Sequence, residues 1–415
     1  MSTLLLLGVP AGAVVGIDCS VWRAGPHVRG IAAVPPGVHF VHCTAGALRA
    51  GFVVSTGHDQ LLVWRWDADA EVLVPDVDPS QLERYRASWP EFEPFLAPYP
   101  LDGDTDPAIA ADPAAGADHA AAPRGQYAKW QRLTSHISPA VLARILPPSG
   151  AVSAMTSISH FSDIPASASR TAGSVLARSL VPGELESNAD RIRFSPIDLK
   201  RSFPPGATGA QLTKFSLDKS FLLESAISGP YGGDETLLLG EFQLAFVIFL
   251  IGQVYDGFEQ WKTMVQLVYL SSDALRTRTA FFSAFTVDQL RIQLEECPSD
   301  FFHDSLASGS FLHTAIKRFA ENMRESDASL APALVLASGR LTDFLFERFN
   351  WVAVPRISTL DDSDSDDADL DGDGIPRADY RIRSTFACRN EGGVVDDIED
   401  EEDDEYRPVI VYDVE

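Results

Sequence analysis

The chain has 415 residues, of which 45% are hydrophobic and 22% are charged, a composition typical of globular domains. Its formal net charge is -26, from 33 basic and 59 acidic side chains. Affinity for a phosphate backbone comes mainly from basic groups that displace counterions, so this charge disfavours direct binding to nucleic acid. The length predicts two or three folded units.

The first 75 residues have the pattern of β-strands separated by Gly and Pro. A strand is expected at Leu4 to Leu7, another after Gly37, and two more in residues 51–66 around a turn. The last of these places three apolar side chains on one face, where we expect them in the core: Leu62, Trp64 and Trp66. The segment predicts a small antiparallel sheet or sandwich.

The apolar opening of the chain does not have the pattern of a secretory signal, because no basic residue precedes the short run from Leu4 to Leu7. The longest apolar run, Leu244 to Ile251, is far below the roughly 20 residues that cross a bilayer. We therefore expect no membrane-spanning segment.

Helical patterns follow the strands. Asp78 before Pro79 is typical of a helix start, and the pattern continues to about residue 98. A second helical pattern begins at Tyr127. Between them, residues 101–125 are rich in Ala, Asp and Pro and predict a disordered insertion. Together these features predict an N-terminal domain over residues 1–150 with appended helices.

The second half of the chain is predicted to be an all-α bundle over residues 201–352, joined to the first domain by a Ser/Ala/Gly/Pro-rich linker at 151–200. Residues 240–252 are apolar on all sides, which marks a buried central helix. Two later helices have apolar side chains three or four residues apart, which we expect in the core: Phe258, Trp261, Val265 and Val268, then Leu341, Phe344 and Leu345.

Residues 353–405 predict an acidic disordered linker, with 19 acidic and 4 basic side chains between Asp361 and Glu405. Ser363 and Ser365 lie in this acidic context, which acidophilic kinases favour, and we expect both to be phosphorylated. An unmodified, solvated linker is the alternative.

The terminal residues 406–415 predict a strand-forming tail. Pro408 biases Arg407 toward extended geometry, and the residues after it are mostly β-branched or aromatic. We expect the tail to add a strand to a sheet of a partner protein, with these residues at the contact: Arg407, Pro408, Val409, Ile410, Val411, Tyr412 and Val414. The alternative is that the tail pairs with the N-terminal sheet of its own chain.

No catalytic set stands out. Gly8, Gly12 and Gly16 have the spacing of a dinucleotide-binding loop, but such a loop must open a helix that receives the pyrophosphate. A Gly/Pro break at Gly25 leaves no room for that helix, and no alternating βα units follow. A short-chain-type oxidoreductase is therefore the disfavoured alternative, and we expect no enzymatic activity and no cofactor.

Metal and disulfide sites are not predicted either. His39, His42 and Cys43 lie close together in the sequence, as metal ligands do. His39 and His42 are expected on opposite faces of a strand, however, so we do not expect them to bind one metal ion. A calcium-like spacing begins at Asp367, but Ala378 stands where a bidentate Glu is needed. The cysteines are scattered, which indicates reduced thiols in the cytosol or nucleus: Cys19, Cys43, Cys297 and Cys388.

The opening segment resembles the signature of the cistron-splicing factor family. The matching positions are Gly8, Pro10, Gly12, Gly16, Ile17, Asp18, Trp22, Gly25, Pro26, Gly30, Ile31, Pro35, Pro36, Gly37, His39 and Phe40. Further stretches agree in the same order and begin at Phe95, Tyr127, Phe203, Gly240 and Cys297. The similarity covers roughly Leu4 to Trp351 and the terminal residues, whereas the insertion after Pro100 and the acidic block depart from it.

The resemblance implies a β-sandwich-like N-terminal domain and a helical domain similar to VHS bundles. It also implies an assembly chaperone of the U5 snRNP precursor, cytoplasmic and nuclear, that supports pre-mRNA splicing. Its implied partner is pre-mRNA-processing-splicing factor eight, bound at its RNase H-like and MPN-like domains so that the helicase and the snRNA are kept off until maturation. The free protein is expected to be a monomer. A generic protein-interaction adaptor with another partner is the alternative.

Overall fold

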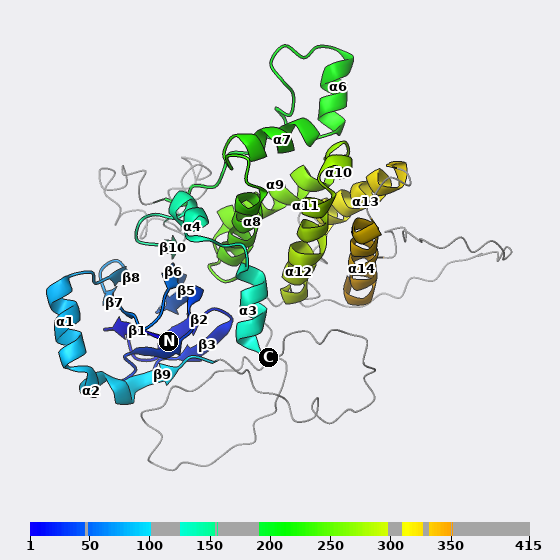
Figure 1. Ribbon diagram of the computed structural model, residues 1–415. Helices are drawn as coiled ribbons and strands as arrows, with labels where there is room; N and C mark the ends of the chain where they lie inside the picture. The colour runs from blue at the N-terminus through cyan, green and yellow to red at the C-terminus, as the bar shows by residue number, and fades with distance from the viewer. Residues whose placement is uncertain are drawn as a thin grey trace, which may run out of the picture.

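The computed structural model describes residues 1–45, 49–100, 125–153, 156, 191–297, 309–326, 332–349 and 351. Within these residues the protein belongs to the α+β class, with a β-sheet domain at the N-terminus and a helical region after it. Helices α3 (Gln126–Thr134) and α4 (Pro139–Ile145) lie where the two parts meet (Figure 1).

The N-terminal domain contains two five-stranded sheets. The first has the order β8-β7-β1-β4-β9 and consists of β1 (Ser2–Leu7), β4 (Gly30–Val34), β7 (Leu61–Asp67), β8 (Val72–Pro75) and β9 (Leu96–Pro98). The second has the order β10-β6-β5-β2-β3 and consists of β2 (Val14–Ile17), β3 (Ser20–Arg23), β5 (Gly37–Thr44), β6 (Arg49–Thr56) and β10 (Ala151–Ser153).

The two sheets share one hydrophobic core, to which β1, β2, β4, β5, β6 and β7 contribute buried side chains. Phe52 of β6 stacks on Trp64 of β7 with ring centroids 4.0 Å apart. Trp64 is buried, and Leu62 and Trp66 pack partly buried beside it, which confirms the predicted core face of this strand. Burial of such large aromatic and aliphatic surfaces is the main stabilising contribution to this domain.

The first sheet is mixed, which corrects the expectation of a purely antiparallel domain. Strand β1 pairs in parallel with β7, and β4 pairs in parallel with β9. The turn at 57–60 carries the chain from β6 in the second sheet to β7 in the first, so these two strands are not a hairpin. Alternation in the sequence defines the two faces of a strand but not the strand with which it pairs.

Helix α1 (Pro79–Ala87) begins where the sequence predicted. The Asp78 carboxylate accepts a hydrogen bond from the N–H of Ser80 at 2.9 Å, which satisfies one of the unpaired donors of the first turn. Short α2 (Trp89–Phe92) and the 3-10 turn η1 (Glu93–Phe95) follow. The helical stretch ends there and does not reach residue 98, because the next three residues form β9 against β4.

The helical region is built around α8, which is buried on every side from residue 238 to 248, as predicted. Its elements are α6 (Ala210–Leu217), α7 (Ser220–Ser228), α8 (Glu235–Leu250), α9 (Tyr255–Tyr269), α10 (Ala274–Thr277), α11 (Thr279–Ser283), the π-helix η5 (Ala284–Arg291), α12 (Ile292–Glu296), α13 (Gly309–Glu325) and α14 (Pro332–Phe349). The predicted core positions of α9 and α14 are confirmed: Phe258, Trp261, Val265, Val268, Leu341 and Leu345 are buried, and Phe344 packs partly buried.

The boundary between the two parts differs from the prediction. Val141 and Ile145 of α4 are fully buried in the core of the helical region, although the sequence assigned this helix to the N-terminal domain. Residues 151–153 were predicted to open the linker but form β10, which pairs with β6. Ile192, near the end of the predicted linker, is buried in the same helical core. One hydrophobic cluster therefore runs from β5 and β6 through α3 and α4 into the helices.

Several predicted segments lie outside the described residues: 101–124 of the insertion, the acidic residues 353–405 and the tail 406–415. None of the helices in the described ranges has the length and hydropathy that a membrane crossing needs.

Candidate functional site

A buried polar cluster joins three segments of the N-terminal domain. Nδ1 of His39 on β5 lies 2.7 Å from Oδ2 of Asp18, which follows β2. The Tyr99 hydroxyl donates to the same carboxylate oxygen at 2.5 Å, and the Phe40 N–H donates to Oδ1 at 2.9 Å. The side chains of Asp18, His39 and Tyr99 are all buried. The carboxylate therefore connects β2, β5 and the segment after β9.

The His39 ring has hydrogen-bond acceptors at both nitrogens, because Nε2 lies 2.9 Å from the carbonyl oxygen of Pro35. Both nitrogens donate only in the protonated ring. Burial by itself lowers the pKa of His39, but the hydrogen bond and charge of Asp18 outweigh burial and raise the pKa above its ordinary value. None of these side chains lines either of the two cavities described below. The cluster is therefore a structural brace.

The glycine-rich opening forms a turn between β1 and β2 and then β2 itself, and not a nucleotide-binding loop. Gly16 lies inside β2, which pairs directly with β3. In this described segment no helix follows Gly16, so a dinucleotide would find no helix N-terminus for its pyrophosphate. Gly16 is instead required by packing, because a side chain there would overlap the ring of His42 on the neighbouring strand. This arrangement disfavours the oxidoreductase alternative.

His42 lies on the opposite face of β5 from His39, as the spacing predicted, and shares its face with Phe40 of the helical core. It is fully buried, and neither ring nitrogen has a hydrogen-bond partner among the described residues. Burial, followed by the charge of Arg49, lowers its pKa to about 3. Arg49 donates to the carbonyl oxygen of Ile251 at 2.8 Å and so links β6 to the end of α8.

A second buried polar cluster joins α4 to the helices. Glu241 of α8 is fully buried and forms an ion pair with Arg144 of α4. Its carboxylate also accepts hydrogen bonds from the Ser195 N–H at 2.7 Å, the Ser195 hydroxyl at 2.8 Å and Nε2 of Gln260 at 2.8 Å. A buried carboxylate is tolerated only when its charge and lone pairs are satisfied in this way.

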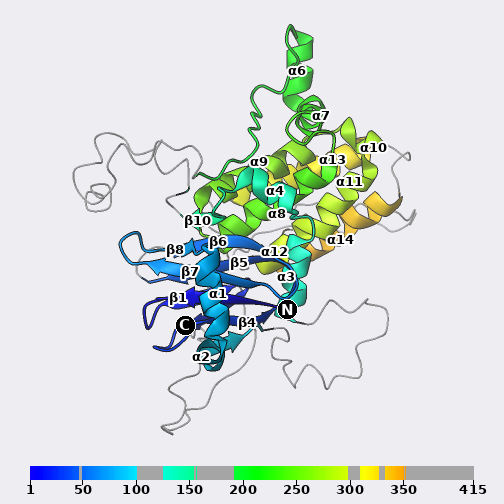
Figure 2. The ribbon, with the colours of Figure 1, turned by 60° about the vertical axis from the view of Figure 1, so that its left-hand side comes forward.

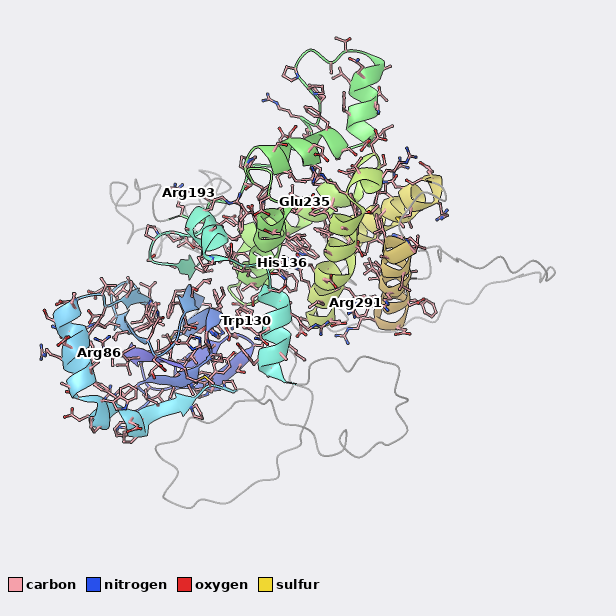
Figure 3. All side chains as sticks on the ribbon, viewed as in Figure 1. Arg86, Trp130, His136, Arg193, Glu235 and Arg291 are labelled. Atoms are coloured by element: carbon pink, nitrogen blue, oxygen red, sulfur yellow. The ribbon has the colours of Figure 1, made fainter. Side chains whose placement is uncertain are left out.

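Further contacts make the junction between the two parts rigid. Arg144 donates to the carbonyl oxygen of Pro230 at 3.1 Å, and its guanidinium carbon lies 4.5 Å from the centroid of the Tyr231 ring. Trp130 of α3, labelled in Figure 3 beside the sheets, donates from Nε1 to the carbonyl oxygen of Val38 at 2.6 Å. The N–H of His136 donates to Gln243 of α8 at 2.7 Å. The sheets, α3, α4 and α8 are thus held in one body.

A groove runs between the sheets and α4 and encloses a cavity of about 630 Å³. Strands β6, β7 and β8 line one side, and α4 with residues 146–150 lines the other. Its lining is mainly apolar and includes Val54, Val77, Leu142 and Pro148. Arg193, which Figure 3 shows beside α4, also lines it.

Two properties make this groove the candidate binding site of the described residues. The side chain of Val77 is 76% exposed, although valine gains by burial. The indole N–H of Trp64, which also lines the groove, has no acceptor within the described part of the chain. An apolar recess with a few polar groups is typical of a site that receives a segment of another molecule.

A second cavity, of about 640 Å³, lies beside α7 and α10. It is lined by Glu224, Glu235 and Asp273. Arg278 forms ion pairs with Glu224 and Glu235, and Lys214 forms one with Asp273, so the charges of this cavity are largely compensated.

Metal-ligating and thiol side chains show no site in the described part of the chain. No group of three or more His, Cys, Asp or Glu side chains there is arranged to hold a metal ion. The described cysteines Cys19, Cys43 and Cys297 are buried and form no disulfide, and burial raises the pKa of Cys43 to about 11. Cys388 and the calcium-like stretch from Asp367 lie outside the described residues.

The predicted contact residues of the tail also lie outside the described residues, as do Ser363 and Ser365. Sequence reasoning missed the groove, because Val77 and Leu142 are distant in the sequence and neither belongs to a recognisable motif. It also missed the brace, although Asp18 and His39 were among the positions of the opening signature.

Comparison with known proteins gives matches in both parts of the chain. Residues 1–147 match the family model described as the AAR2 N-terminal domain, and residues 194–353 match the AAR2 C-terminal repeat region. The mouse protein AAR2 homolog is 30% identical over 374 residues, which cover 84% of this chain and 89% of the mouse protein. The human protein AAR2 homolog is 30% identical over 77% of this chain and 82% of its own length. For the Caenorhabditis elegans homolog the identity is 29%, over 84% of this chain and 93% of that protein.

Proposed function

The chain belongs to the AAR2 family, and on this premise we propose that it is an assembly chaperone of the U5 snRNP precursor that supports pre-mRNA splicing. Its proposed partner is pre-mRNA-processing-splicing factor eight, which it binds at the RNase H-like and MPN-like domains. Occupation of these domains keeps the helicase and the snRNA off until maturation. The proposed activity is binding alone, in the cytoplasm and nucleus, without catalysis or a cofactor.

The observation that carries this proposal is the single body formed by two domains of different class. One hydrophobic cluster and the Arg144–Glu241 pair fix the sheets and the helices relative to one another. A rigid body of this kind holds two surfaces at a set distance, which is what a protein needs to occupy two domains of one partner together. Within this proposal the paired sheets are the sandwich-like domain and the helical region is the VHS-like bundle.

Charge supports a protein partner over a nucleic acid. The net charge of -26 opposes a phosphate backbone, so regulation of snRNA binding would act through occupation of the partner and not through contact with the RNA. We expect the purified chain to give no salt-sensitive mobility shift of U5 or U6 snRNA.

The groove between β6, β8 and α4 is the proposed contact for an apolar segment of the partner. Val77→Asp places a charge at a highly exposed apolar position of the groove and is expected to weaken binding without unfolding the protein. Leu336→Asp on α14 is the matched control, because Leu336 is also an exposed apolar side chain but lies outside the groove.

The deciding experiment is affinity purification of the tagged full-length chain, followed by quantitative mass spectrometry. The proposal expects the splicing scaffold in near-equal amount with the wild-type chain and with Leu336→Asp, and less of it with Val77→Asp. Capture of a different protein in stoichiometric amount would favour the generic adaptor. Saturable binding of a nicotinamide cofactor would favour the oxidoreductase alternative.

A further inference from the structure

Residues 199–217 form an arm that projects from the helical region and ends in helix α6. Figures 1 and 2 both show α6 standing away from the rest of the fold. No residue of α6 is buried, which sets it apart from the long helices α8 and α9. A helix of eight residues is marginal in water by itself, so its position depends on how its base is held.

The base of the arm is closed by a buried lysine. The ammonium of Lys219 donates to the carbonyl oxygen of Leu199 at 2.9 Å and to the hydroxyl of Ser202 at 2.9 Å. The Ser202 hydroxyl in turn donates to the carbonyl oxygen of Phe215 at 2.5 Å. Lys219 thus joins the two ends of the arm. A buried charge is retained only when it is satisfied, and here it fixes the arm as a loop of set geometry.

The adjacent residue attaches the same base to the body of the bundle. The Asp218 carboxylate accepts from the N–H of Ser272 at 3.0 Å and from the N–H and hydroxyl of Ser220 at 2.9 and 2.6 Å. The ring of Phe215 packs on Phe221 of α7 with centroids 5.5 Å apart. These contacts fix the base of the arm to the helical region, so the arm is not a loosely attached loop.

The arm exposes large apolar side chains. Leu217 is 62% exposed and Leu212 is 37% exposed, and Phe203 before the helix is exposed as well. At 3.6 residues per turn, the two leucines lie roughly 140° apart around the helix. Apolar side chains on two sides of a helix match the two walls of a groove better than a flat surface.

The arm also differs in charge from the rest of the chain. Residues 199–217 contain Lys200, Arg201 and Lys214 and no acidic residue, whereas the whole chain has a net charge of -26. Lys214 pairs with Asp273 at 3.1 Å, while Lys200 and Arg201 form no ion pair among the residues that the structure describes. An arm that carries basic residues as well as exposed apolar side chains is complementary to an apolar groove with acidic residues at its edge.

We propose that the α6 arm is a second docking element, which inserts into an apolar groove with an acidic rim on the partner protein. This inference rests on the proposed function, because the groove that receives the arm is assigned to the partner, the splicing scaffold. RNA is the disfavoured occupant, because phosphates would leave the exposed side chains of Leu212 and Leu217 uncovered and the net charge of the chain opposes them.

The test measures binding of the full chain to a recombinant scaffold fragment that contains the RNase H-like and MPN-like domains, by biolayer interferometry at 50 and 300 mM salt. Leu212→Asp/Leu217→Asp removes the apolar contact and is expected to weaken binding at least tenfold. Lys200→Glu/Arg201→Glu is expected to weaken it mainly at low salt and to reduce its salt dependence. Leu336→Asp, an exposed leucine of α14, should bind as the wild type does. Thermal unfolding of each variant checks that the fold is retained.

The outcomes distinguish a failure of this inference from a failure of the proposed function. If the wild type binds the fragment and both arm variants bind equally well, the arm is not a docking element although the proposed function stands. If the wild type fails to bind at 10 µM, the proposed function and the inference both fall. If Lys200→Glu/Arg201→Glu instead abolishes an RNA mobility shift of the wild type, the occupant is a nucleic acid and the inference is wrong.

Discussion

Nδ1 of His39 lies 2.7 Å from Oδ2 of Asp18, and this pair holds β5 to the turn after β2 inside the sheet core. Asp18 has a backbone φ of 56°, a value uncommon for residues other than glycine. The three hydrogen bonds to its carboxylate therefore maintain a turn that the backbone by itself does not favour.

Replacement of Tyr99 by Phe removes one donor to this carboxylate and leaves the other two. We expect Tyr99→Phe to lower the free energy of unfolding by about 1–2 kcal/mol. Asp18→Ala leaves His39 and Tyr99 without their acceptor and should cost more, about 3 kcal/mol or above. Urea unfolding measures both. Equal costs for the two variants would show that Asp18 is not the centre of the cluster.

The protonation of His39 provides an independent check of the brace. Because Asp18 raises the pKa of His39, the folded state binds this proton more tightly than the unfolded state. The resulting stability is fully present below the unfolded pKa of about 6.5 and is lost as pH rises through the folded value. In Asp18→Asn the NMR titration of His39 should shift to lower pH. A titration that stays in place would contradict the assigned cause.

The Arg144–Glu241 pair leads to a prediction about the junction of the two parts. Arg144→Met leaves Glu241 buried without its cation and should lower the free energy of unfolding by about 3–5 kcal/mol. The double variant Arg144→Met/Glu241→Leu removes the unpaired charge and should recover part of this loss. Since one hydrophobic cluster spans both parts, unfolding in urea should remain a single transition. Two separate transitions in the wild type would show that the parts are independent.

His42 should make the protein sensitive to acid. Its pKa is about 3 in the folded state against about 6.5 when unfolded, so the unfolded state binds the additional proton between these values. Its contribution to the free energy of unfolding therefore falls by about 1.4 kcal/mol for each pH unit between about pH 6 and pH 4. His42→Leu should reduce the slope of stability against pH between 6 and 4 by that amount. The exposed His58→Leu is the control, and equal slopes in both variants would refute the assignment.

The tail leads to a prediction that combines stability and binding. Because the tail is predicted to bind a partner and not its own chain, truncation after Glu405 should leave the thermal unfolding temperature unchanged. It should weaken capture of the MPN-like domain, as should Val411→Pro, which removes one backbone donor from the strand. Lost thermal stability with unchanged capture would instead indicate that the tail pairs with its own N-terminal sheet.

The sequence by itself determined the local elements and the family. Alternation placed Trp64 in a sheet core, an apolar run identified α8, and the Asp78–Pro79 pair located the start of α1. These signals are visible in sequence because each depends on the conformation of neighbouring residues or on the burial of one face. The resemblance of the opening signature agrees with the family matches in both halves of the chain.

Tertiary structure alone decided which elements lie together. Strands β6 and β7 entered different sheets, residues 96–98 became β9, and α4 joined the helical core. The groove beside Val77 is lined by segments that are far apart in the chain. The base of the α6 arm is held by the buried ammonium of Lys219, whose hydrogen-bond partners no sequence pattern identifies. The physical reason is that a periodic pattern specifies a face to be buried, while the surface that covers it is chosen by the shape and charge of distant residues.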